Sequence, residues 1–162
     1  MSNTTTKETQ ITVPDDIPAV RIVREFDATP DKVFRAHMDP ELFVQWIGPD
    51  EIETTEIDRW DARTGGEWRY VARQGDEAYW FRGSFHEVRP NEVIVQTFSF
   101  EPWPDAVSLE RLELEALDDG RTRLTTLSLM DSFEARDAMV ASGMEVGIDE
   151  GYRSLDRLLA EG

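Results

Sequence analysis

The chain contains no cysteine, and this absence removes several kinds of chemistry at once. Disulfide bonds, thiolate metal sites and cysteine nucleophiles are all excluded. With 162 residues, the chain can bury about two-thirds of its unfolded surface, so it needs no covalent or metal staple to fold. The same length predicts one domain.

Long apolar runs are missing as well. The first ten residues are polar, with neither a basic start nor an apolar stretch, so they do not form a secretory signal. No stretch approaches the roughly 18 apolar residues that a membrane span requires. Together with the lack of cysteine, these features predict a cytoplasmic protein that does not enter a membrane.

Basic residues are scarce beside acidic ones. The chain has 17 Lys and Arg against 34 Asp and Glu, which gives a formal net charge of −17. Such a field repels phosphate groups, so we expect neither nucleic acid nor an anionic membrane surface as a partner. The ordinary consequence of this acidity is solubility, and the alternative is attraction of a basic partner.

Motifs for cofactors, metals and nucleophiles are also absent. The chain has two histidines, His37 and His86, and they are too far apart in sequence for an H-x-x-x-H zinc motif. No glycine-rich phosphate loop, dinucleotide fingerprint or G-x-S-x-G motif occurs. We therefore expect no cofactor, no metal and no catalytic residue, and we expect His86 to be a structural residue of a strand.

Hydrophobic periodicity divides the chain into a tail and one domain. Residues 1–17 are polar and threonine-rich, and they predict a disordered tail before a domain over 18–162. The domain pattern predicts a strand, two short helices, six strands and a helical C-terminus. The expected strands are 19–26, 52–60, 67–74, 78–88, 92–101, 107–117 and 121–130. Short turns between them predict antiparallel pairing and an α+β fold.

The C-terminal segment from Ser132 onward carries apolar residues mostly at three- and four-residue steps, which is typical of a helix. Ser142 and Gly143 predict a break between a short helix and a long final one. Gly147 and Gly151 lie inside the long helix, where glycine is unfavourable. They predict close packing against another element, or a bend.

Aromatic residues crowd the middle of the chain, and period-two spacing places several of them on shared strand faces. This pattern is compatible with a closed core or with a cavity. Polar residues interspersed among the aromatics favour a ligand cavity; they are Arg69, Arg82, Gln96, Thr97 and Glu101.

Several segments together resemble a known family. The segments are Arg24 to Ala36, Asp39 to Leu42, Trp46, Gly48–Pro49, Asp61 to Arg69, Phe81 to Val88, Thr97–Phe98, Gly120 to Leu124, Arg136 to Met139, Gly143 to Glu145 and Leu155 to Leu158. Their order resembles the family of the activator of heat-shock protein 90 ATPase, C-terminal domain type, within the START-like (SRPBCC) superfamily. The resemblance implies a helix-grip fold, as in the birch pollen allergen: a curved antiparallel sheet of about seven strands around a long C-terminal helix, with a cavity between them.

The resemblance and the aromatic pattern lead to one preferred function and two alternatives. We expect a small apolar ligand, such as a lipid- or polyketide-like metabolite, to bind in the cavity. The predicted cavity residues are Trp46, Trp68, Tyr70, Phe81, Phe85, Phe98, Met144, Ile148 and Tyr152. The alternatives are a co-chaperone-like domain that binds a protein, and a cyclase or hydrolase that uses Arg69, Arg82, His86 or Glu101. The chain is expected to be a monomer or a homodimer.

Overall fold

The computed structural model describes residues 8–161, which form one sheet and four helices. The strands are β1 (Gln10–Thr12), β2 (Ala19–Phe26), β3 (Thr54–Trp60), β4 (Glu67–Gln74), β5 (Glu77–Arg89), β6 (Val93–Phe100), β7 (Val107–Ala116) and β8 (Thr122–Leu129). The helices are α1 (Pro30–Met38), α2 (Pro40–Trp46), α3 (Phe133–Ala141) and α4 (Met144–Glu161).

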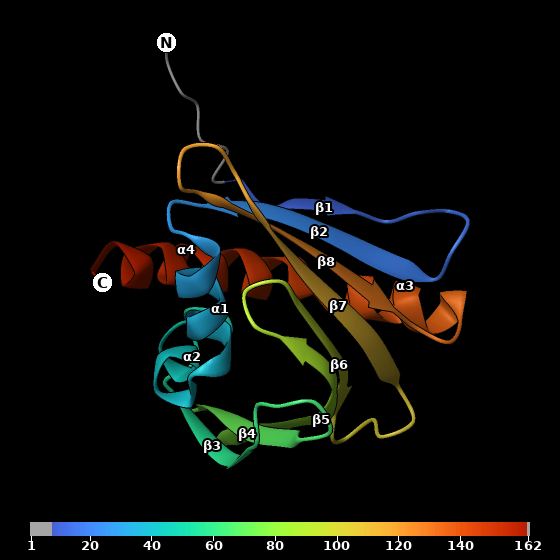
Figure 1. Ribbon diagram of the computed structural model, residues 1–162. Helices are drawn as coiled ribbons and strands as arrows, with labels where there is room; N and C mark the ends of the chain where they lie inside the picture. Colours follow the sequence, from blue (N-terminus) through green and yellow to red (C-terminus); the bar gives the residue numbers. More distant parts are fainter. Residues whose placement is uncertain (1–7, 162) are drawn as a thin grey trace.

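The eight strands form a single antiparallel sheet in the order β1-β2-β8-β7-β6-β5-β4-β3. Consecutive strands from β3 to β8 are neighbours, and β2 pairs with β8 along its whole length. The sheet curves around α4, with α1 and α2 at one end of the concave side and α3 toward the other (Figure 1). The predicted α+β helix-grip fold is therefore confirmed, with eight strands in place of about seven.

The additional strand, β1, lies within the segment that we expected to be a disordered tail. Its residues pair with β2, in the register Ile11 to Ile22. Buried Arg136 of α3 also binds this segment, because its Nη1 donates to the carbonyl oxygens of Pro14 and Ile17 at 2.8 and 3.3 Å. Backbone pairing and one arginine thus order a polar segment that buries little surface, and an apolar pattern cannot reveal such contacts. Residues 1–7 of the predicted tail lie outside the described residues.

The C-terminal helices follow the prediction closely. Gly143 has a φ of 84° and separates α3 from α4. At Gly151, an added Cβ would lie 3.1 Å from the carbonyl oxygen of Trp46 and 3.4 Å from the amide nitrogen of Gly48. The glycine thus allows the close approach of α2 to α4, which agrees with the close packing predicted from its position inside a helix.

A buried ion pair joins the sheet to α4. Arg24 of β2 is almost fully buried, and its two terminal nitrogens donate to the carboxylate of Asp156 at 3.0 and 2.7 Å. The pair lies beside Phe26, whose ring contacts the edge of Tyr152. Arg24 and Asp156 therefore set the position of the final helix on the concave face.

Candidate functional site

A cavity of about 660 Å³ lies between the concave face of the sheet and the helices. All nine residues that the sequence singled out lie in its lining: Trp46, Trp68, Tyr70, Phe81, Phe85, Phe98, Met144, Ile148 and Tyr152. The volume falls within the range of small-molecule sites in proteins. The role of these nine residues in ligand binding remains a prediction.

Aromatic rings from the sheet form one wall of the cavity. The ring centroids of Trp68 and Tyr70 on β4 are 5.5 Å apart, and Phe81 on β5 lies 5.2 Å from Tyr70. Phe98 on β6 lies 5.7 Å from Trp68 and 5.4 Å from Phe81. The alternation of side chains along neighbouring strands brings these rings to the concave face.

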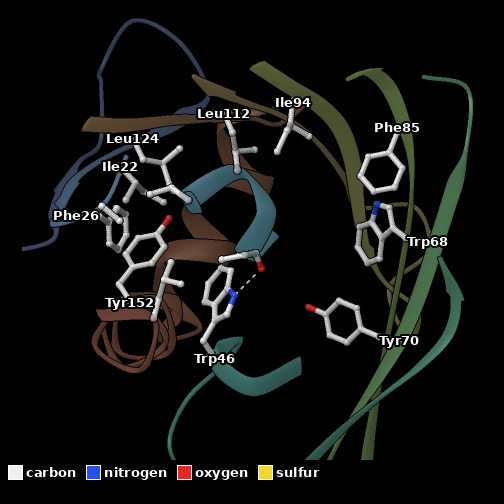
Figure 2. Close-up of a cluster of buried hydrophobic side chains, with 14 of the residues drawn as sticks. Ile22, Phe26, Trp46, Trp68, Tyr70, Phe85, Ile94, Leu112, Leu124 and Tyr152 are labelled. Carbon is white, nitrogen blue, oxygen red and sulfur yellow. Dashed lines mark hydrogen bonds between the residues drawn. The ribbon is translucent and has the colours of Figure 1, made fainter. Parts of the chain in front are cut away.

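The helices provide the opposite wall. The indole of Trp46 on α2 stacks on Tyr152 of α4 with centroids 6.1 Å apart, and its Nε1 donates to the carbonyl oxygen of Ala36 at 2.9 Å. Figure 2 shows Trp46 and Tyr152 facing Trp68 and Tyr70, with the Tyr70 hydroxyl pointing away from its strand toward Trp46. Phe43 contacts both Trp46 and Tyr70 and so joins the two walls.

A glycine makes room for the Trp68 ring. Gly83 of β5 is paired with Trp68, and a Cβ at this position would lie 2.6 Å from the indole and 2.0 Å from the carbonyl oxygen of Thr97. The indole therefore lies over the backbone of the neighbouring strand. Because Gly83 has no Cβ, the Trp68 indole can lie close to the backbone of β5, which leaves more space in the cavity.

Polar side chains cross the sheet side of the cavity in one row. Gln96, Glu110 and Ser128 are register partners on β6, β7 and β8, and all three line the cavity. Gln96 Nε2 donates to Glu110 Oε1 at 3.0 Å, and Ser128 Oγ donates to Glu110 Oε2 at 3.2 Å. The Glu110 carboxyl is thus held in place by two neutral donors.

The surroundings of Glu110 change its acidity and that of nearby phenols. Burial raises the pKa of the Glu110 carboxyl, because removal from water disfavours the charged form. Burial also raises the pKa of Tyr70, and it raises that of Tyr152 to about 12; the negative charge of Glu110 adds to both effects. His37 also lines the cavity, and burial lowers its pKa. The cavity therefore favours neutral forms of its own side chains.

Two buried polar groups in the lining have no regular hydrogen bond. Among the side chains of the described residues, three buried nitrogen or oxygen atoms lack a partner: Arg24 Nε, Trp68 Nε1 and Thr126 Oγ1. Trp68 and Thr126 both line the cavity. The Thr126 hydroxyl approaches the Tyr152 phenol without regular hydrogen-bond geometry. Unpaired buried polar groups are uncommon, so these two atoms are candidate contacts for a ligand.

Most of the polar residues that first suggested a cavity lie elsewhere. Only Gln96 is in the lining, whereas Arg69, Arg82, Thr97 and Glu101 are not. Arg69 lies on the other face of β4, where its Nε donates to Glu101 at 2.6 Å and its guanidinium stacks over Trp80 at 3.9 Å. Strand alternation explains this, because a residue next to an inward aromatic points outward.

The residues proposed for the enzyme alternative also lie outside the cavity, because side chains alternate between the two faces of a strand. His86 is exposed on β5, and none of Arg69, Arg82, His86 and Glu101 lines the cavity. Among the described residues, no group of three or more His, Asp or Glu is placed to hold a metal ion.

Glu110 is the functional candidate that the sequence analysis missed. Its signal was present, because Leu112 and Leu114 follow it at two-residue steps and point to the same face of β7. Exposed Leu109 obscured the pattern, since it places an apolar residue on the opposite face. A carboxylate in phase with buried leucines is expected to face the interior.

The fold and the cavity define a helix-grip domain of the START-like class. The sequence model of the family described as activator of Hsp90 ATPase homolog 1-like protein matches residues 27–160. The chain therefore belongs to this family. The family and the fold support, in general terms, a ligand-binding or co-chaperone-like domain.

Solved structures from several bacteria share the fold. A protein from Rhodobacter sphaeroides is 25% identical with a TM-score of 0.85, and the alignment covers 95% of this chain and 99% of that one. A protein from Arthrobacter aurescens is 24% identical with a TM-score of 0.84, covering 94% and 92%. Protein Ms6760 from Mycobacterium smegmatis is 22% identical with a TM-score of 0.82, covering 95% and 99%.

A search of curated proteins found no match to this chain. Within residues 8–161, no helix has the length and apolar character that would allow it to cross a membrane.

Proposed function

We propose that the protein binds a small, largely apolar ligand in the cavity between the sheet and α4. The observation that carries this proposal is the cavity itself, which has about 660 Å³ of space and a mainly aromatic and aliphatic lining. A well-packed domain leaves few voids larger than a water molecule. A space of this size, bounded by rings on both sides, is suited to hold a molecule of drug-like dimensions.

The ligand also needs at least one polar group. The indole N–H of Trp68 has no acceptor within the protein, and the Thr126 hydroxyl lacks a regular partner. A ligand oxygen that accepts from Trp68 would remove an unfavourable buried donor. The proposed ligand is therefore amphiphilic, with an apolar body against the rings and an oxygen near β4.

One opening of the cavity lies between the β6–β7 connection and α3. Exposed lining residues mark this region: Trp103 is 60% exposed and Val107 is 43% exposed, while Ala138 and Ser142 on the helical side are also exposed. Trp103 packs edge-on against Phe100, which leads into the aromatic wall. A ligand that enters here meets apolar surface along its path.

Native mass spectrometry of the protein purified from the cells in which it occurs tests the proposal. We expect one small molecule per chain, released on denaturation and identifiable after extraction. Met139→Trp, which fills the lining from α3, should abolish the bound mass, whereas Ala141→Trp on the same helix outside the lining should retain it. Two results together would overturn the proposal. The wild-type protein would show no bound small molecule in the mass spectrum, and its tryptophan fluorescence would not change when lipids or aromatic polyketides are added.

An enzyme of the cyclase or hydrolase type is the second candidate, and Glu110 is the observation in its favour. A carboxyl whose pKa is raised by burial is a candidate to exchange a proton with a bound substrate. The extracted ligand distinguishes the two functions. When it is returned to fresh protein, a binding protein releases it unchanged, whereas an enzyme converts it to a product of different mass or retention.

A further inference from the structure

We propose that the ligand of this cavity carries a protonated amine, which pairs with Glu110. This inference rests on the proposed binding function and specifies the chemical class of the ligand. Three observations support it: the charges that line the cavity, the partners of Glu110 and the rings around it.

Charges in the cavity lining are of one sign. Glu110 and Glu51 are the acidic residues in the lining, and no lysine or arginine of the described residues lines it. Glu51 is exposed and so lies where the cavity meets solvent, whereas Glu110 lies inside. With a net charge of −17 over the whole chain, the field favours entry of a cation and opposes entry of a carboxylate or phosphate.

Glu110 differs from three other partly buried carboxylates of the described residues, each of which has a basic partner. Partly buried Glu25, Glu101 and Asp156 each pair with an arginine at 3.2 Å or less. Glu110 instead accepts hydrogen bonds from Gln96 and Ser128, which are neutral. A carboxylate buried without a counter-charge is unfavourable, and a ligand ammonium would supply that charge.

The geometry leaves room for such a contact. Each oxygen of Glu110 accepts one hydrogen bond from the protein, so each retains a lone pair for an N–H of the ligand. The two donors fix the carboxyl on the cavity side of β7 without neutralising it. In its ionised form, which a ligand ammonium would stabilise, the carboxylate faces the space where a ligand would lie.

The aromatic lining suits a cation as well as an apolar body. Trp46, Trp68, Tyr70 and Tyr152 present four electron-rich rings to the cavity, and such rings attract ammonium groups. The Glu110 charge acts on the phenols of both Tyr70 and Tyr152, so the carboxyl and these rings share one electrostatic environment. An amine attached to an apolar body matches both parts of the lining.

Calorimetric titration with three probes of one shape tests this inference: naphthylmethylamine, naphthylmethanol and naphthoate, at about 150 mM salt to screen the net charge. We expect the amine to bind at least about tenfold more tightly than the alcohol, and naphthoate to bind most weakly. In Glu110→Gln the amine should lose this advantage while the alcohol binds as before. Glu113→Gln, which removes a charge from the exposed face of the same strand, should keep it.

The outcomes separate this inference from the function on which it rests. If the alcohol binds as tightly as the amine, or naphthoate binds best, the charge preference is wrong while ligand binding stands. If the amine preference persists in Glu110→Gln, the pairing with Glu110 is wrong. If none of the three probes binds, the binding function and this inference both fail for ligands of this shape. The wild-type ranking alone decides the first case, even if the variant does not fold.

Discussion

Glu110 lines the cavity, and its burial lowers the free energy of unfolding of the protein without a ligand when the carboxyl is ionised. Its pKa is raised above the ordinary value of 4.5, so the folded state binds the proton more tightly than the unfolded state. The stability that this proton binding provides is complete below about pH 4.5 and is lost as the pH rises through the folded-state pKa. At neutral pH the protein without a ligand is therefore less stable with Glu110 than it would be with a neutral residue at this position.

Replacing Glu110 by glutamine should stabilise the empty protein, and more so at higher pH. Urea unfolding at pH 5 and pH 8 measures the difference between the variant and the wild type. We expect Glu110→Gln to have the higher free energy of unfolding at pH 8 and a smaller gain at pH 5, because the wild-type carboxyl is more protonated there. Glu113→Gln shows the effect of removing one charge alone. A gain that grows toward pH 5 would contradict the argument.

Gly83 offers a second test at this scale. Gly83→Ala places a methyl group against the Trp68 indole and the carbonyl oxygen of Thr97. Because backbone cannot yield as a flexible side chain can, we expect a loss of about 2 kcal/mol in the free energy of unfolding. Urea titration followed by tryptophan fluorescence measures it. Ser84→Ala, on an exposed neighbouring position, should change stability little, and equal effects would argue against the close contact.

The wall residues could be predicted because aromatic side chains at two-residue steps share a face of a strand. That periodicity located Trp68, Tyr70, Phe81 and Phe98. The polar residues could not be placed as well, since Arg69 and Glu101 adjoin inward aromatics in sequence yet pair on the outer face. Glu110 could not be recognised as a cavity residue, because exposed Leu109 weakens the alternation along β7 and because its partners Gln96 and Ser128 come from other strands.

At the scale of elements, the Arg24–Asp156 pair is a buried ion pair that holds the final helix against the sheet. Arg24 is 1% exposed, and the Asp156 side chain is 19% exposed. Removing one member of a buried pair leaves an uncompensated charge in a low-dielectric site. The effect is therefore much larger than that of an ion pair in water.

Asp156→Ala should lower the free energy of unfolding by about 3 kcal/mol, because it leaves the buried Arg24 guanidinium without a counter-charge. Glu67→Ala, which breaks the exposed Arg59–Glu67 pair, should lower it by about 0.5 kcal/mol or less. Urea titrations of both variants beside the wild type provide the measurement. Similar losses in the two variants would show that Arg24 finds other partners or water.

Elements were easier to predict than the contacts between them. Prolines at the starts of α1 and α2 and the glycine after α3 mark the boundaries locally. In contrast, β1 is ordered by pairing with β2 and by Arg136, which lies more than 100 residues away. No local pattern in residues 8–17 encodes the arginine that binds them.

At the scale of the whole molecule, the net charge of −17 opposes compaction. Raising the salt concentration from about 10 to 150 mM screens this repulsion, so we expect the melting temperature to rise. The exposed ion pairs lose some strength in salt, but each contributes little. Scanning calorimetry in sodium and potassium chloride measures the effect. Equal rises in both salts indicate screening, and a fall would mean that surface pairs outweigh the net repulsion.

The pairing of β2 with β8 has a consequence for how the molecule is made. The two strands are separated by about 100 residues, so during synthesis the first long strand leaves the ribosome well before its main partner. The apolar side chains of Ile22 and Phe26 therefore stay exposed to solvent until β8 and α4 have been synthesised. Contacts this distant in sequence are typical of domains that fold in milliseconds to seconds. The cavity is therefore completed late, because residues of β8 and α4 line it and these elements are made last.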